Sequence, residues 1–298
     1  MTQSNNNMSV LPFYRSLQMQ NHRRSFSYGR IYPLLAPSNY LLPFQIYEPN
    51  LDAALNVISV TDLRAWLYDR KGNVVKDFTQ SLIDGGLAVK AFEKDYSIVF
   101  PARGAFNRLD EGQYYIELKD TKNGVDYYSE IFVMVHDLSG CLRIEWFNVE
   151  DHDTGIGKIV YQDPAFSWRL YLHAELGKPE YKTEEEGATR DGYFFPTKQV
   201  SYKVYKAFFP APEYLLDVMR LIWCADVVKI IDSYGQVFYS DTFDVHESWD
   251  DQGDVSKTRI EFTTDTVIKK NGRAVIDTSA LRGDYNQDYD DDMTNQQG

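Results

Sequence analysis

The sequence predicts a mainly β protein: an N-terminal immunoglobulin-like β-sandwich followed by a second β-rich domain that carries one α-helix. Short segments of alternating apolar and polar residues recur from about residue 30 to about residue 270, with turn signals between them. Tyrosine is abundant, with 22 copies in 298 residues. Its apolar ring and polar tip suit half-buried strand faces and protein interfaces.

The predicted sandwich covers residues 38–139. Within it, "NVISVTDLRAWLYDRKGNVVKDF" has the pattern of two strands joined at "RKGN", with Leu63, Ala65 and Leu67 on one face. At least five strands of this kind are expected, which favours an immunoglobulin-like architecture. The Cys…Trp…Cys pattern of antibody domains is absent from the sequence, so the prediction concerns architecture alone.

The clearest predicted hairpin of this domain is "GQYYIELKDTKNGVDYYSEIFVMV", residues 112–135. Asn123 and Gly124 stand between two aromatic-rich strands. Both residue types adopt positive φ angles readily, so the pair predicts a tight type I′ turn.

The second predicted domain covers residues 140–271 and again consists mostly of strands, with a hairpin turn at "DSYGQ". "APEYLLDVMRLIWCAD" differs, and predicts a helix over about residues 212–225. Pro212 suits the first helical position, where its missing N–H is not needed. Apolar side chains then recur at helical spacing, at Leu215, Val218, Met219 and Ile222.

The two termini differ in charge. Residues 1–37 are predicted to be an extended arm, and the sequence has four arginines but no acidic residue before Glu48. A transit peptide and a disordered tail are alternative interpretations. The preferred hypothesis is an arm that docks on a partner protein. The candidate docking residues are Leu11, Phe13, Tyr14, Arg23 and Arg24. Residues 272–298 are predicted to be a flexible acidic tail.

Composition also limits the function. The net charge of −13 argues against nucleic acid as a tightly bound partner. No apolar run approaches the length of a membrane span, and no signal peptide is recognised, so synthesis in the cytoplasm is expected. The two cysteines, Cys141 and Cys224, are expected to be buried free thiols, with a disulfide as the alternative.

The most acidic internal segment is "GKPEYKTEEEGATRDGYFF", which contains Glu184–Glu186. Adjacent side chains of an extended chain point in opposite directions, so three successive glutamates do not converge on one metal ion or substrate. The sequence therefore predicts a solvated loop, with an acid–base or metal site as the alternative. Tyr193–Phe195 are expected to begin a strand that the core or a partner covers.

Other polar clusters also lack the pattern of a site. Glu150–Asp153 surround His152 with carboxylates, but no second histidine lies at a metal-binding spacing. Residues 284–292 alternate like a calcium loop, but they lack its central glycine and closing glutamate. No nucleophile elbow around a serine, such as would pair with His246, and no phosphate-binding loop is present. We therefore expect no enzymatic activity and no cofactor.

Several phrases resemble a known group of proteins. They include "SNYLLPFQIYE", "GQYYIELKDTKNGVDYYSEIF", "LRIEWFNVEDHDTGIGKIVYQD" and the stretch from "ELGKPEYKTEEEGATRDGYFF" to "CADVVKIID". Over about residues 38–271 the chain resembles neck and tail structural proteins of crAss-like and related phages and prophages of Bacteroidales. The resemblance implies a ring or hub protein of the virion, between portal and tail tip, assembled in the host cytoplasm. It implies no catalytic residue.

The expected partners follow from this resemblance. They are other copies of the chain in a closed ring (about six or about twelve), neighbouring portal, neck or tail proteins, and DNA as transient cargo of a channel. A membrane anchor is not expected. The alternative is a carbohydrate- or receptor-binding module of a tail tip or cell-surface apparatus, with Trp146, Trp168 and Trp249 stacking on sugars.

Overall fold

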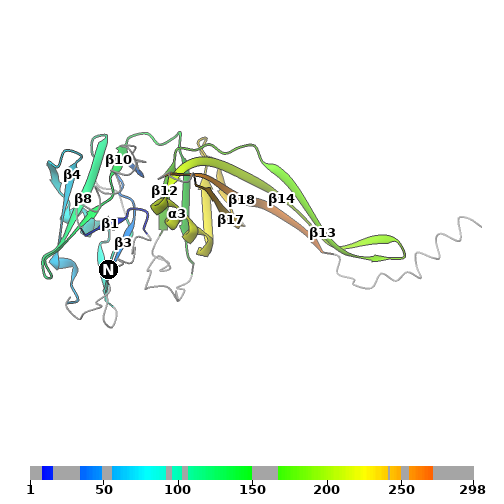
Figure 1. Cartoon of the computed structure of the whole chain (residues 1–298), viewed down its shortest axis with the longest axis horizontal. Coiled ribbons are helices and arrows are strands. Elements are labelled where there is room, and N and C mark those ends of the chain that lie inside the picture. Colours follow the sequence, from blue (N-terminus) through cyan, green and yellow to red (C-terminus); the bar gives the residue numbers. More distant parts are fainter. Residues whose placement is uncertain are drawn as a thin grey trace, which may run out of the picture. The chain divides into compact units, whose positions relative to one another are not determined.

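The computed structural model describes most of the chain and shows a mainly β protein (Figure 1). Of the described residues, 60% are in strands and 10% in helices. The described residues are 9–15, 34–48, 56–91, 96–102, 107–149, 167–240, 242–249 and 255–270. Their strands form four sheets. By its contacts the chain divides into a first unit, Met1–Glu180 with Val204–Thr264, and a second unit, Tyr181–Lys203 with Asp265–Gly298.

The largest sheet has seven strands and lies in the first unit. Its main path is β1-β9-β8-β10-β2, and β4 joins it through β8 and pairs in turn with β5. All described pairs in this sheet are antiparallel except β10 with β2, which is parallel. The bounds are β1 Phe13–Tyr14, β2 Leu34–Pro37, β4 Leu63–Asp69, β5 Val74–Asp77, β8 Gly112–Asp120, β9 Val125–Ser129 and β10 Phe132–Val135.

A smaller antiparallel sheet has the order β3-β7-β6, with β3 at Phe44–Glu48, β7 at Tyr96–Phe100 and β6 at Ala88–Ala91. Every residue of β7 is buried, so this strand has apolar neighbours on both faces. Two short helices, η1 at Val60–Asp62 and α2 at Thr79–Asp84, flank β4 and β5 in the chain.

The strand pattern around residue 65 is confirmed. Leu63, Ala65 and Leu67 of β4 are buried, while the intervening Arg64 is exposed and Trp66 is half-buried. The chain then turns at "RKGN" into β5, with Gly72 at a φ of 85°. A mainly β chain with several sheets is thus confirmed. The immunoglobulin-like sandwich is not confirmed.

The predicted type I′ turn between β8 and β9 is wrong, although the hairpin itself is confirmed. Asp120 pairs with Val125, so four residues form the loop, and of Asn123 and Gly124 only the glycine has a positive φ. The Asp120 carboxylate accepts hydrogen bonds from the backbone N–H groups of Lys122 (2.9 Å) and Asn123 (3.0 Å). These two hydrogen bonds stabilise the four-residue loop that begins after Asp120, and so favour it over a two-residue turn at Asn123 and Gly124.

A third sheet has the order β12-β11-β15-β16, with β11 at Leu142–Phe147, β12 at Ser167–Leu172, β15 at Val227–Ile231 and β16 at Val237–Tyr239. The turn at "DSYGQ" between β15 and β16 is confirmed, and the Asp232 carboxylate accepts hydrogen bonds from the backbone N–H groups of Tyr234 and Gln236. Gly235 has a φ of 81° there, where a side chain would be strained.

The fourth sheet, β13-β14-β18-β17, contains the longest strands: β13 at Glu180–Arg190, β14 at Tyr193–Pro212, β17 at Thr242–Ser248 and β18 at Val255–Lys270 (Figure 1). The predicted helix follows β14. It comprises α3 at Glu213–Met219 and a 3-10 turn, η3, at Arg220–Cys224. Leu215, Met219 and Ile222 are buried, as the helical spacing predicted.

The predicted domain boundary near residue 140 stays a prediction. No sheet among the described strands combines elements from both sides of this position. However, the first unit contains residues from both sides, and the guanidinium of Arg169 lies 4.5 Å from the centre of the Tyr40 ring.

Both cysteines are free, as expected, but only Cys141 is buried. Cys224, at the end of η3, is exposed.

Candidate interaction surface

The second unit contains a three-stranded arrangement of β13, the first part of β14 and the last part of β18. We call residues 181–190, 193–203 and 265–270 the ribbon. Asp191 and Gly192 join β13 to β14 with φ angles of 52° and 85°. Two successive positive φ angles are typical of the type I′ turn. The Asp-Gly dipeptide was the sequence signal for this hairpin, and the sequence prediction did not use it.

The predicted loop around Glu184–Glu186 is wrong, because these residues lie within β13. Their side chains are exposed, and each accepts a hydrogen bond from a side chain of β14. The donors are Tyr202 to Glu184 (2.5 Å), Gln199 to Glu185 (2.8 Å) and Lys198 to Glu186 (2.9 Å). Glutamate has a low strand propensity, and these cross-strand partners compensate for it.

Replacing all three residues of 184–186 with glutamine is expected to leave folding and any response to divalent metal ions unchanged within a few tenths of a kcal/mol, as is usual for exposed positions. Glutamine keeps the acceptor oxygen, so the hydrogen bonds to β14 can persist. Thermal unfolding with and without Ca²⁺, Mg²⁺ or Zn²⁺ would test this. A metal-dependent rise of the wild-type melting temperature that the triple variant loses would contradict it.

The ribbon has no core of its own. None of its described side chains is buried, and several large apolar ones are exposed. Tyr193 and Phe194 at the start of β14 are 72% and 49% exposed. A strand does begin here, as expected. The Phe194 ring lies against Gly187 of β13, but both rings keep much of their surface exposed. The other exposed apolar side chains of the ribbon are Tyr181, Val267 and Ile268.

The turn of the ribbon offers a local test of its stability. Replacing Gly192 with valine places a β-branched residue at a φ of 85°. This conformation costs an L-residue about 1–2 kcal/mol, so amide protection in β13 and the first part of β14 should fall about 5- to 30-fold. Hydrogen exchange would measure it. Gly140→Ala is the matched control, since Gly140 has no atom near its Cβ position and no positive φ. Equal protection in the Gly192→Val variant and wild type would contradict the turn assignment.

The predicted docking residues lie elsewhere in the chain, and the structure places three of them inside the first unit. Leu11, Phe13 and Tyr14 are buried, and β1 pairs with β9 through Phe13–Ser129 and Tyr14–Tyr128. Leu11 and Phe13 belong to the core of their own chain, so their side chains contact this chain where docking on a partner was expected. The other two predicted docking residues, Arg23 and Arg24, lie outside the described residues.

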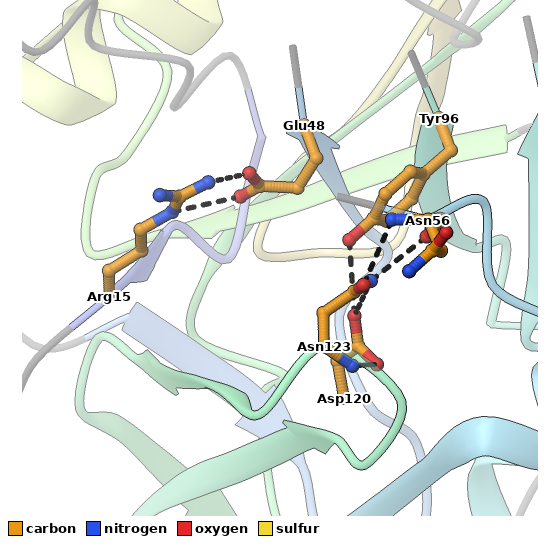
Figure 2. A network of polar contacts seen from close by, with 6 residues as sticks. All are labelled: Arg15, Glu48, Asn56, Tyr96, Asp120 and Asn123. Atoms are coloured by element: carbon orange, nitrogen blue, oxygen red, sulfur yellow. Dashed lines mark hydrogen bonds and ion pairs between the residues drawn. The ribbon is translucent and has the colours of Figure 1, made fainter. Parts of the chain in front are cut away.

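Polar contacts hold the N-terminal strand in place. The guanidinium of Arg15 forms an ion pair with Glu48, whose side chain is almost fully buried (Figure 2). The hydroxyl of Tyr14 donates to Glu130 (3.3 Å), and the backbone N–H of Glu130 donates to the carbonyl of Pro12 (2.8 Å). A buried carboxylate needs such a partner, so loss of Arg15 would leave Glu48 buried without its cation.

A second polar cluster in Figure 2 surrounds the fully buried Asp120. Its carboxylate accepts hydrogen bonds from the Tyr96 hydroxyl (3.2 Å) and from the side-chain amide of Asn123 (2.7 Å), which also donates to the carbonyl of Asn56 (2.9 Å). Burial raises the pKa of Tyr96, which keeps its phenol protonated and able to donate. With its lone pairs occupied and no exposed surface, Asp120 organises the hairpin turn and has no access to a substrate.

The aromatic platform required by the carbohydrate-binding alternative is incomplete. Trp146 and Trp168 are buried, and their rings stack with centroids 6.3 Å apart. They belong to the core of the third sheet. Trp249 is 41% exposed, so one of the three tryptophans named for that alternative has a ring accessible to a ligand.

The described residues show no group of three or more His, Cys, Asp or Glu side chains that could hold a metal ion. The clusters Glu150–Asp153 and 284–292 lie outside them, and His246 is exposed on β17. In the same part of the chain, no helix is long and apolar enough to span a membrane. Comparisons with models of protein families, with curated proteins and with solved structures found no match to this chain.

Proposed function

We propose that this chain is a structural subunit of a phage neck or tail, and that copies of it form a closed ring through which DNA passes. The resemblance of several sequence phrases to neck and tail proteins of crAss-like phages suggests the particle. The ribbon is the observation that supports assembly. A sheet normally buries at least one face. The ribbon, in contrast, buries none of its described side chains and exposes Tyr193, Phe194 and Val267. A partner would supply the missing cover.

Charge is consistent with the proposed channel. A net charge of −13 repels phosphate groups, which favours sliding of the DNA through the channel and opposes its binding to the wall.

The proposal also includes the fold of the sheets that precede residue 140. We propose an immunoglobulin-like relation between the seven-stranded sheet and the β3-β7-β6 sheet, because residues of both contribute to one continuous core.

Native mass and negative-stain images of the purified chain would test the proposal, at low and high salt. A discrete closed assembly is expected for wild type. A variant in which residues 182–201 are replaced by Asp-Gly should remain folded, since none of their described side chains is buried, but should stay monomeric, about 2 kDa below the 34.6 kDa of the wild-type chain. A wild-type chain that is monomeric at every concentration, or a shortened chain that still forms the assembly, would contradict the proposal.

A further inference from the structure

The ribbon has two open edges of different character. β13 is the terminal strand of its sheet, so one side of its backbone has no strand partner among the described residues. β18 is covered on its outer side by β17, but this pairing includes only Lys257–Thr263. From residue 264 to Lys270 no described strand pairs with that side of β18. Unpaired strand edges present N–H and C=O groups that can pair with another strand.

The two edges carry opposite charge. β13 has three adjacent carboxylates, Glu184–Glu186, and their contacts from β14 include one cation, Lys198, since the other two donors are neutral. The β18 edge ends in Lys269 and Lys270, which are exposed and have no acidic partner among the described residues. Each edge therefore repels a copy of itself and attracts the other edge.

The opposite charges also lie at about the same level along the ribbon. The ammonium group of Lys198 in β14 lies 2.9 Å from the carboxylate of Glu186 in β13, so these two residues are at nearly the same height along the ribbon. Lys203 of β14 contacts Asp265, and Tyr205 stacks on Phe262, so β14 and β18 run antiparallel. Continuing that register places Lys198 opposite Lys270, within about one residue if a bulge intervenes. Glu186 and Lys270 are thus nearly level on the two outer strands.

We propose that the β18 edge of one copy (residues 264–270) pairs with the β13 edge of the next copy. This rests on the proposed self-assembly and specifies its contact. With the ribbon strands along the ring axis, rotation about that axis keeps each residue at the same height, so Lys269 and Lys270 of one copy would meet Glu185 and Glu186 of its neighbour. β13 and β18 both run antiparallel to β14, and the new pair is therefore parallel. Such a head-to-tail contact repeats around the ring until it closes.

Charge reversal tests the pairing. The variants Glu185→Lys with Glu186→Lys, and Lys269→Glu with Lys270→Glu, are each expected to reduce the native mass to that of the monomer. A chain with all four changes should assemble again, because the edges are complementary once more. Glu175→Lys and Lys178→Glu are matched controls, since both residues are exposed and lie outside the ribbon. Assembly of either reversed chain to the wild-type mass, or failure of the fourfold variant to recover, would overturn the proposal.

Cysteine cross-linking gives a second readout that tolerates weakened ribbon folding. In a Cys224→Ser background, chains with Thr183→Cys and chains with Val267→Cys, which are opposite each other in this register, are mixed and oxidised. Disulfides between the two kinds of chain are expected, with few within either kind. Like-with-like disulfides would show two-fold edge pairing and overturn the proposal. A wild-type assembly without cross-links would overturn this contact alone, whereas a wild-type monomer would overturn the proposed function as well.

Discussion

Replacing Leu215 with aspartate is expected to leave the first unit molten or insoluble. The side chain lies in α3, is 1% exposed and belongs to the continuous core. Truncation of a buried leucine to alanine costs about 2–5 kcal/mol, and an unpaired carboxylate in the same place adds a desolvation cost. Because a domain of this kind is stable by about 5–15 kcal/mol, the combined loss removes much of that margin.

Thermal unfolding and the near-ultraviolet circular dichroism of the soluble fraction would measure the effect of Leu215→Asp. The matched control is Glu213→Ala in the first turn of the same helix, where the side chain is exposed and little change is expected. Full solubility of the Leu215→Asp chain, with an unchanged melting temperature, would show that α3 does not anchor this core.

Local patterns in the sequence were sufficient for some elements. The helix was predictable because Leu215, Met219 and Ile222 recur at helical spacing and Pro212 marks its start. The strand β4 was predictable because alternate residues are apolar. The turn at "DSYGQ" was predictable because Asp232 and Gly235 are typical turn residues whose contacts are within a few positions of each other.

Other features depend on contacts that a local pattern does not contain. Apart from the Asp-Gly turn that follows it, β13 has a sequence typical of a solvated loop, and partners 12–18 positions away donate hydrogen bonds to Glu184–Glu186. The turn at 123–124 was mispredicted because Asp120, outside the dipeptide, selects a longer loop. Only part of the candidate interaction surface was predicted, for the same reason. The sequence indicated a strand at Tyr193–Phe195, but the open edge of β18 follows from strand pairing, which no local sequence pattern shows.

The N-terminal strand is the clearest example of such a long-range contact. Leu11, Phe13 and Tyr14 were expected to dock on a neighbour, since nothing near them in the sequence could cover them. Their partners are distant: Ser129 and Tyr128 by backbone pairing, and Phe44 by a ring contact at 4.6 Å. A stretch with no local partners for its apolar side chains can thus complete the core of its own chain.

Deletion of residues 1–15 is therefore expected to destabilise the first unit severely, rather than to leave a folded subunit that only fails to assemble. The deletion removes the buried Leu11 and Phe13, for which single truncations to alanine cost about 2–5 and about 3–5 kcal/mol. It also removes Arg15 and leaves the carboxylate of Glu48 buried without its cation. Denaturant and thermal unfolding would measure the loss, with deletion of residues 1–8 as the control.

A peptide of residues 7–17, added to the truncated chain, separates this explanation from a general effect of shortening. If the strand acts through its contacts with β9, Glu48 and Phe44, the peptide should bind the folded form and raise the melting temperature in a concentration-dependent way. A peptide with Leu11→Asp and Phe13→Asp should not. An unchanged melting temperature for the chain without residues 1–15 would contradict the structural role. Rescue by the peptide would show in addition that β9, Glu48 and Phe44 accept this strand from another molecule, so a second copy could supply it within an assembly.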